Sequence, residues 1–154
     1  MGEGPSLGLR HLHHETELAH RLFEGDHHQE AVRKAAERYV NRVAELADHP
    51  DAQDRQGKGL IERVFSETSP ILTLNSHETL DEWTLLDRDA HNGYRFLGVG
   101  LALAIRNATT HADEYPLTET EALEWLAFIS AMHRRLDGAQ QFVPTPETEP
   151  DEDK

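Results

Sequence analysis

Two long stretches of the chain place apolar residues at the three- and four-residue spacing of an amphipathic α-helix. In the first stretch these residues are Val32, Ala35, Ala36, Tyr39, Val43, Leu46 and Ala47. In the second, which follows the capping-box sequence Thr118–Glu121, they are Ala122, Trp125, Leu126, Ile129, Met132 and Leu136. Nowhere do apolar and polar residues alternate as in a half-buried strand. We therefore predict an all-α fold, a bundle of four to five helices.

The remaining sequence predicts a single domain and its boundaries. Shorter helices are predicted from Leu9 to Phe23 and around Leu60–Phe65. Loops are expected over residues 49–59 and 71–83. The predicted organisation is a flexible N-terminus (residues 1–8), a helical domain (9–138) and an acidic, proline-rich disordered tail (139–154).

A further helix is predicted to begin between residues 80 and 89 and to end near Thr110. Its second half is apolar on nearly every side, which is typical of a buried helix. Gly93, Gly98 and Gly100 interrupt it, and each glycine weakens a helix by about 1 kcal/mol relative to alanine. We infer that another helix or backbone segment packs very closely against this part of the chain.

The composition restricts the classes of function. The chain of 154 residues has a formal net charge of −14 and no cysteine. Binding to nucleic acid depends on neutralised phosphates, so an acidic chain must use a local site for any nucleic-acid chemistry. The N-terminus has no apolar signal segment, and the longest apolar run, Phe96–Ile105, has about half the length of a membrane span. We expect a soluble, cytoplasmic protein that does not enter a membrane.

The segment that follows this apolar run reads RNATTH, from Arg106 to His111. In a structural interpretation, Arg106 complements a helix dipole while Asn107 and His111 satisfy backbone groups. In a functional interpretation, the same side chains bind phosphate and transfer protons. Arg106 and His111 lie about 140° apart on an ideal helix, so they share a face only if the helix unwinds near Thr109–Thr110. Two copies related by a twofold axis would bring both sets into one cleft.

The RNATTH segment resembles the signature of the HEPN superfamily, an arginine and a histidine separated by four to six residues late in a helical bundle. Three longer stretches look like the opening helical pair, the core helix and the closing helix of its Ymh-type, abortive-infection-associated branch. These stretches are ELAHRLFEGDHHQEAVRKAAERYVNRVAEL, GYRFLGVGLALAIRNATTHA and EALEWLAFISAMHRRLDGA. The resemblance covers residues 9–138. It departs at Ala108-Thr109-Thr110, where the branch often has proline, arginine and alanine, so this chain lacks one arginine.

This resemblance implies a HEPN-type homodimer that acts as a metal-independent endoribonuclease, with Arg106, Asn107 and His111 as catalytic residues. His111 would act as general acid or base, Arg106 would hold the phosphate in a bidentate fork, and Asn107 would orient either partner. The 2′-hydroxyl would attack the adjacent phosphate and form a cyclic phosphate without a cofactor or metal. The implied setting is a prokaryotic antiphage defence or toxin–antitoxin system, with an antitoxin or sensor protein as a further partner.

Other interpretations of the sequence stay open beside this hypothesis. A non-catalytic HEPN-like module would bind a partner protein or RNA without cutting it. Arg38 and Arg42, one turn apart, could extend a phosphate-binding path or form ion pairs with Glu37, Glu45 or other acids.

The N-terminal histidines offer a separate alternative. His13 and His20 are two helical turns apart with Glu17 between them, and could bind a divalent metal. They could equally belong to a solvated polar face, because their spacing matches no standard metal motif.

Overall fold

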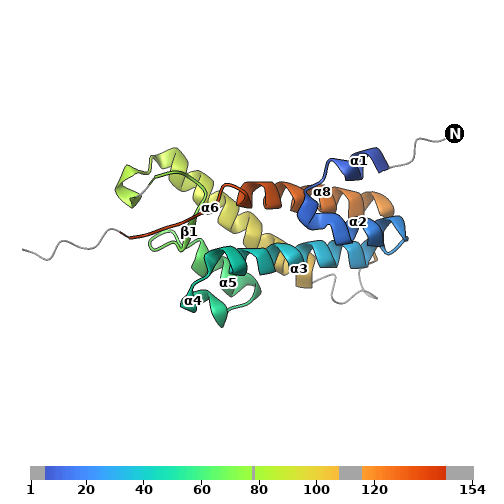
Figure 1. The fold of residues 1–154 in the computed structure, drawn as a ribbon, viewed down its shortest axis with the longest axis horizontal. Coiled ribbons are helices and arrows are strands. Elements are labelled where there is room, and N and C mark those ends of the chain that lie inside the picture. Colours follow the sequence, from blue (N-terminus) through green and yellow to red (C-terminus); the bar gives the residue numbers. More distant parts are fainter. Residues whose placement is uncertain (1–5, 78, 108–115, 145–154) are drawn as a thin grey trace, which may run out of the picture.

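The structure is a computed structural model that describes residues 6–77, 79–107 and 116–144 (Figure 1). The first helices are α1 (Ser6–Arg10), η1 (His14–Thr16), α2 (Glu17–Glu24), α3 (His28–Ala47), α4 (Pro50–Gln53) and α5 (Gly57–Val64). They are followed by β1 (Leu72–Thr73), η2 (Leu80–Glu82), α6 (Leu85–Gly100), η3 (Leu101–Asn107), α8 (Glu119–Leu136) and β2 (Gln140–Gln141). The prediction of an all-α bundle is confirmed.

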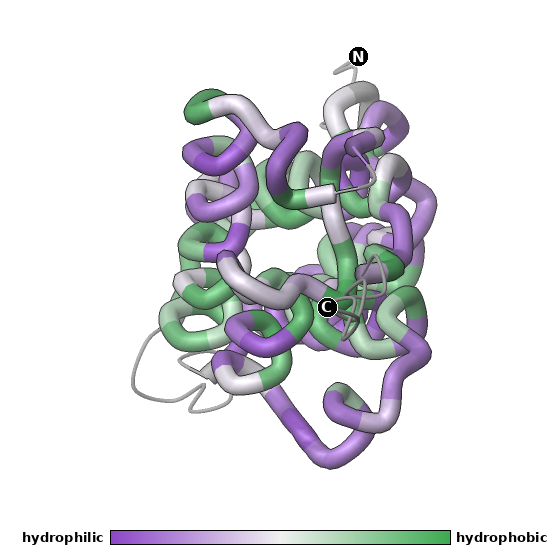
Figure 2. The backbone as a smooth tube through the Cα atoms, turned by 90° about the vertical axis from the view of Figure 1, so that its left-hand side faces the viewer, coloured by the Kyte–Doolittle hydropathy of each residue, from purple (hydrophilic) through white to green (hydrophobic). Residues whose placement is uncertain are grey.

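Helix α3 is the centre of the bundle and packs against α2, α5, η3 and α8. Its buried residues are Ala31, Val32, Ala35, Ala36, Tyr39, Val40, Val43 and Ala47. Their spacing confirms the predicted helix face. A view along the long axis shows hydrophobic and hydrophilic segments alternating along the helices (Figure 2), as expected of helices that bury one face. Helix α3 ends where Asp48 adopts the left-handed conformation of a C-cap, with φ of 40°.

Helix α8 begins with the predicted capping box. The Thr118 hydroxyl accepts a hydrogen bond from the Glu121 N–H, and the Glu121 carboxylate accepts one from the Thr118 N–H. Leu126 and Ile129 on its apolar face are fully buried. Helix α8 lies alongside α3 over much of its length (Figure 1), and these two helices are the longest in the described part of the chain.

The N-terminal region differs from the prediction. Residues 6–8, expected to be part of a flexible N-terminus, belong to α1, and the helix expected from Leu9 to Phe23 is interrupted between α1 and η1. His13 holds the interruption against α8, because its backbone N–H donates to the Ser130 hydroxyl at 2.8 Å. This long-range contact has no counterpart in the local sequence pattern.

Two predicted irregular regions also contain structure. The expected loop over residues 49–59 includes α4, which Pro50 favours because its fixed φ suits the first helical position. At the C-terminus, residues 139–144 are not a free tail: β2 pairs antiparallel with β1, with Leu72 opposite Gln141. The remaining residues of the predicted tail, 145–154, lie outside the described part of the chain.

Helix α6 continues directly into η3, which has π-helical hydrogen bonding. The prediction that this helix is buried on nearly every side is wrong, since Phe96 is 64% exposed and Leu97 is 45% exposed. The helix packs on the bundle through its other side, which includes Gly98 and Leu101. No helix in the described residues is both long and apolar enough to cross a membrane.

Candidate functional site

The predicted catalytic segment begins at the end of η3. Leu101, Ala102 and Ile105 are buried, so the bundle core anchors this π-helical turn. The hydrogen bonding of the helix changes from α-helical to π-helical at Leu101. The unwinding was predicted further on, at Thr109–Thr110, and these two residues lie outside the described part of the chain. Single π-helical turns within helices are frequent at functional sites. The turn alters the direction in which later side chains leave the helix.

Arg106 is half-buried and lies beside the first turn of α5. A Cβ atom built on Gly57 would be 3.0 Å from Nη1 of Arg106. The guanidinium therefore lies against the backbone of Gly57. Gly57 is buried and has a φ of 53°, in the left-handed region that favours glycine.

The first turn of α5, Gly57-Lys58-Gly59, adds positive potential beside Arg106. The first N–H groups of an α-helix have no partner within the helix, and Gln56 at the N-cap makes no side-chain hydrogen bond to them. These N–H groups and the helix dipole favour an anion at this end. The guanidinium of Arg106 thus lies beside a helix N-terminus, on a chain whose net charge is −14.

The structure describes part of the predicted catalytic set. Asn107 is the last residue of η3, but its side chain and the whole of His111 lie outside the described residues. Arg106 is therefore the predicted catalytic side chain whose position is known, and the roles assigned to Asn107 and His111 stay predictions.

An apolar stripe runs along the solvent side of α6 and η3. We define the α6 stripe as Leu86, Gly93, Phe96, Leu97, Gly100 and Leu103. The leucines and Phe96 are between 45% and 77% exposed. Cβ atoms built on Gly93 or Gly100 would meet no other part of the described chain within 4 Å beyond the local helix backbone. Contiguous exposed apolar surface is typical of interaction sites.

Gly98 is on the opposite side of α6 and shows the close packing that was predicted for the glycines. A Cβ atom there would lie 3.0 Å from Cγ2 of Ile61 and 3.2 Å from the Tyr39 hydroxyl. The inference of close packing within the chain is therefore confirmed for Gly98. Gly93 and Gly100 face open space instead.

Arg38 and Arg42 belong to an ion-pair network between α3, η1 and the end of α8. Arg38 Nε donates to Glu15 at 2.6 Å, and its Nη1 and Nη2 donate to Glu45 at 2.8 and 3.0 Å. Arg42 Nη2 donates to Asp137 Oδ1 at 2.6 Å. The hydrogen bonds from Arg38 hold the pKa values of Glu15 and Glu45 below their usual range. The structure thus shows the ion-pair alternative for both arginines, and a phosphate path through them has no support.

The N-terminal histidines have separate partners. Nε2 of His13 lies 2.9 Å from Asp137 Oδ2, whereas Nε2 of His20 lies 2.9 Å from the Thr16 hydroxyl. Within the described ranges, no group of three or more histidine or acidic side chains has an arrangement that could hold a metal ion. The His13–Glu17–His20 alternative therefore has no structural support.

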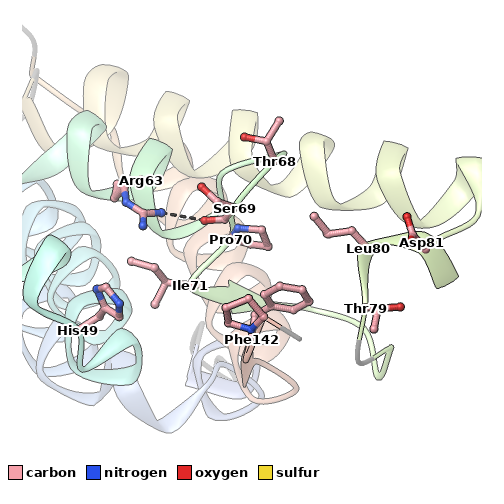
Figure 3. Close-up of a pocket in the computed structure, with 11 residues that line it drawn as sticks. His49, Arg63, Thr68, Ser69, Pro70, Ile71, Thr79, Leu80, Asp81 and Phe142 are labelled. Carbon is pink, nitrogen blue, oxygen red and sulfur yellow. Dashed lines mark hydrogen bonds between the residues drawn. The ribbon is translucent and has the colours of Figure 1, made fainter. Parts of the chain in front are cut away.

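A cavity of about 510 Å³ lies away from Arg106, between the end of α5, η2 and the segment after β2 (Figure 3). Its lining includes His49, Arg63, Pro70, Ile71, Leu80 and Phe142. Arg63 is already engaged there, since it donates to the Ser69 carbonyl at 2.8 Å and to Asp51 at 3.0 Å. The predicted site residues that the structure describes do not line this cavity, which the sequence did not indicate.

The fold and the Arg106 region define a small helical-bundle protein with a candidate anion-binding site at the end of an exposed helix. The chain belongs to the Hypoth_Ymh family, because the family model described as "Protein of unknown function (Hypoth_ymh)" matches residues 10–136. This match confirms the Ymh-type part of the resemblance. No curated protein and no solved structure matches the chain.

Proposed function

We propose that the chain is a HEPN-type, metal-independent endoribonuclease whose active site is completed by dimerisation. The position of Arg106 carries the proposal, because its guanidinium lies against the first turn of α5. An arginine beside a helix N-terminus favours phosphate binding. HEPN membership is part of the proposal and rests on the RNATTH segment and the order of the helices.

In the proposed reaction, the ribose 2′-hydroxyl attacks the adjacent phosphorus atom. His111 of one protomer accepts the hydroxyl proton, the bond from phosphorus to the 5′-oxygen breaks, and His111 of the other protomer protonates that leaving oxygen. Arg106 donates two N–H groups to the non-bridging phosphate oxygens and stabilises the charge that develops on them. Asn107 orients the phosphate or the histidine. The products are a 2′,3′-cyclic phosphate and a 5′-hydroxyl, with no cofactor or metal in the step.

The proposed partner at the α6 stripe is a second copy of the chain. A twofold interface places the same patch of each copy against the other. The open space at Gly93 and Gly100 supports this arrangement, because a second helix can approach the backbone closely there. The stripe extends into η3, the element that also carries Arg106, and in the proposed dimer this contact brings the two catalytic segments toward one cleft.

The proposed cellular role follows from the resemblance of the motif and helix order to abortive-infection proteins. The enzyme would act in the cytoplasm as an RNA-cleaving toxin or effector of a prokaryotic antiphage defence or toxin–antitoxin system. An antitoxin or sensor protein is the proposed partner that controls its activity.

The test compares wild type with Arg106→Ala and Arg55→Ala on single-stranded RNA in excess chelator. Arg55 is the matched control, because it is an exposed arginine whose Nε donates only to the nearby Asp51 carbonyl, at 2.9 Å. We expect wild type and Arg55→Ala to cleave at equal rates, and Arg106→Ala to be slower by about 10²–10³-fold, the usual cost of removing a group that stabilises transition-state charge. Equal cleavage by all three proteins would refute the assignment of Arg106.

The alternative is a non-catalytic helical module that binds a partner protein or RNA. The net charge of −14 and the engagement of Arg38 and Arg42 in ion pairs favour it. RNA binding that depends on Arg106 without any cleavage, or a stable protein complex through the α6 stripe without RNA binding, would support this module over the nuclease.

A further inference from the structure

Gly57 at the start of α5 has two properties that together constrain what can stand at this position. It is buried, and its φ of 53° is a conformation that side-chain-bearing residues rarely adopt. Gly59, two residues later in the same turn, has open space where its Cβ would lie. The constraint therefore belongs to position 57 and not to the turn as a whole.

A Cβ at position 57 would lie 3.0 Å from Nη1 of Arg106. A distance of 3.0 Å is shorter than ordinary van der Waals contact, so one of the two groups would have to move. The guanidinium is at the end of a flexible side chain, whereas Gly57 is part of a buried backbone segment. A side chain at position 57 would therefore displace the guanidinium of Arg106.

We propose that Gly57 is a positioning residue for the Arg106 guanidinium, which its missing side chain allows to lie against the first turn of α5. This inference rests on the proposed function, in which Arg106 holds the phosphate of an RNA substrate. Gly57 itself contacts no substrate, and acts through Arg106. A shift of the guanidinium by a fraction of an ångström weakens a bidentate contact with phosphate, because both N–H groups must align with the oxygens.

The experiment measures the affinity for a 2′-O-methyl RNA oligonucleotide, which binds but has no free 2′-hydroxyl to react. Gly57→Asn is the main variant, since asparagine tolerates the left-handed conformation but adds a Cβ. Gly8→Ala on α1 is the control, because a Cβ there would meet no other part of the described chain within 4 Å beyond the local helix backbone, and lies outside the proposed phosphate site. We expect Gly57→Asn to weaken binding roughly tenfold and Gly8→Ala to leave it unchanged.

A double-mutant cycle separates positioning from a general loss of structure. In an Arg106→Ala background, Gly57→Asn is expected to cause no further loss of affinity. Gly98→Ala provides a second control, because its Cβ would meet Ile61 and Tyr39 in the core rather than Arg106. An equal loss for Gly57→Asn with and without Arg106, or a tenfold loss in folded Gly98→Ala, would overturn the proposal.

A second readout does not depend on RNA. Phenylglyoxal modifies arginine side chains, and mass spectrometry of the peptides gives the rate at Arg106 separately from that at Arg55. We expect Gly57→Asn to change the rate at Arg106 but not at Arg55. If wild type binds no RNA, the proposed function fails, while a changed rate at Arg106 still supports positioning by Gly57. An unchanged rate at Arg106 contradicts the positioning role whatever the RNA result.

Discussion

His133 on α8 makes the stability of the fold depend on pH. Its side chain is fully buried. Its ring is stacked near His13 at a centroid distance of 5.4 Å, and its Nδ1 lies 3.4 Å from Nη1 of Arg42. Burial, with the positive charge of Arg42, lowers the pKa of His133 from 6.5 to about 4. Protonation of His133 therefore opposes folding.

The magnitude follows from the two pKa values. A difference of about 2.5 corresponds to roughly 3 kcal/mol in the free energy of unfolding, at 1.36 kcal/mol for each pKa unit. The folded pKa is the lower one, so this stability is fully present above pH 6.5 and is lost as the pH falls toward 4. Between pH 7 and pH 5 the expected loss from His133 alone is roughly 2 kcal/mol.

The assay is urea unfolding followed by circular dichroism at pH 7, 6 and 5, for wild type and His133→Asn. Asparagine is neutral and keeps a hydrogen-bond acceptor near the position of Nδ1. The variant loses packing at every pH, so the relevant quantity is the slope of stability against pH. We expect wild type to lose roughly 2 kcal/mol more than the variant between pH 7 and pH 5. His91, whose pKa burial also lowers, contributes to both proteins alike. If wild type and His133→Asn lose the same stability between pH 7 and pH 5, His133 is not the cause of the pH dependence.

Three further predictions concern the interface, the ion-pair network and the core. Phe96→Glu in the α6 stripe is expected to convert the dimer to a monomer in sedimentation measurements. The control Leu18→Glu, at a 57% exposed leucine on α2, is expected to leave the dimer intact. A dimer that survives Phe96→Glu would exclude the stripe as the interface. Arg42→Ala is expected to lower the free energy of unfolding by about 1–2 kcal/mol, because it removes a charged hydrogen bond to half-exposed Asp137. The affinity for RNA is expected to stay the same. A loss of RNA affinity would support the alternative in which Arg42 contacts phosphate. Gly98→Ala is expected to destabilise the fold by about 1–3 kcal/mol through overpacking, measured by urea unfolding, and an unchanged midpoint would contradict the close packing of α6.

The long helices could be predicted from the sequence because their signals are local. The apolar spacing of α3 and the capping box at Thr118 each lie within a few residues. The β1–β2 pair could not be predicted, since strands of two residues carry no periodicity and depend on a partner far along the chain. The interruption before η1 also depends on a distant contact, between His13 and Ser130, which are 117 residues apart.

The candidate site was predictable only in part, because its contacts also join residues far apart in the sequence. Arg106 was singled out because it follows an apolar helix, and its catalytic role was predicted from the resemblance of the RNATTH segment to the HEPN signature. Its neighbour Gly57 was missed, although the two glycines that flank Lys58 in an otherwise polar loop were an available signal. The ion pairs of Arg38 and Arg42 were predicted as a class, but Asp137 was not, because it lies 95 residues from Arg42.

The proposed metal-independent RNA cleavage is tested most sharply by the chemical identity of the RNA ends that wild type and His111→Ala produce. The two purified proteins are compared at matched circular dichroism, with excess chelator and a defined single-stranded RNA, and the fragments are analysed by mass spectrometry. We expect 2′,3′-cyclic phosphate and 5′-hydroxyl ends from wild type, and no cleavage by His111→Ala. Fragments with 3′-hydroxyl ends, or equal cleavage by both proteins, would contradict the proposed mechanism.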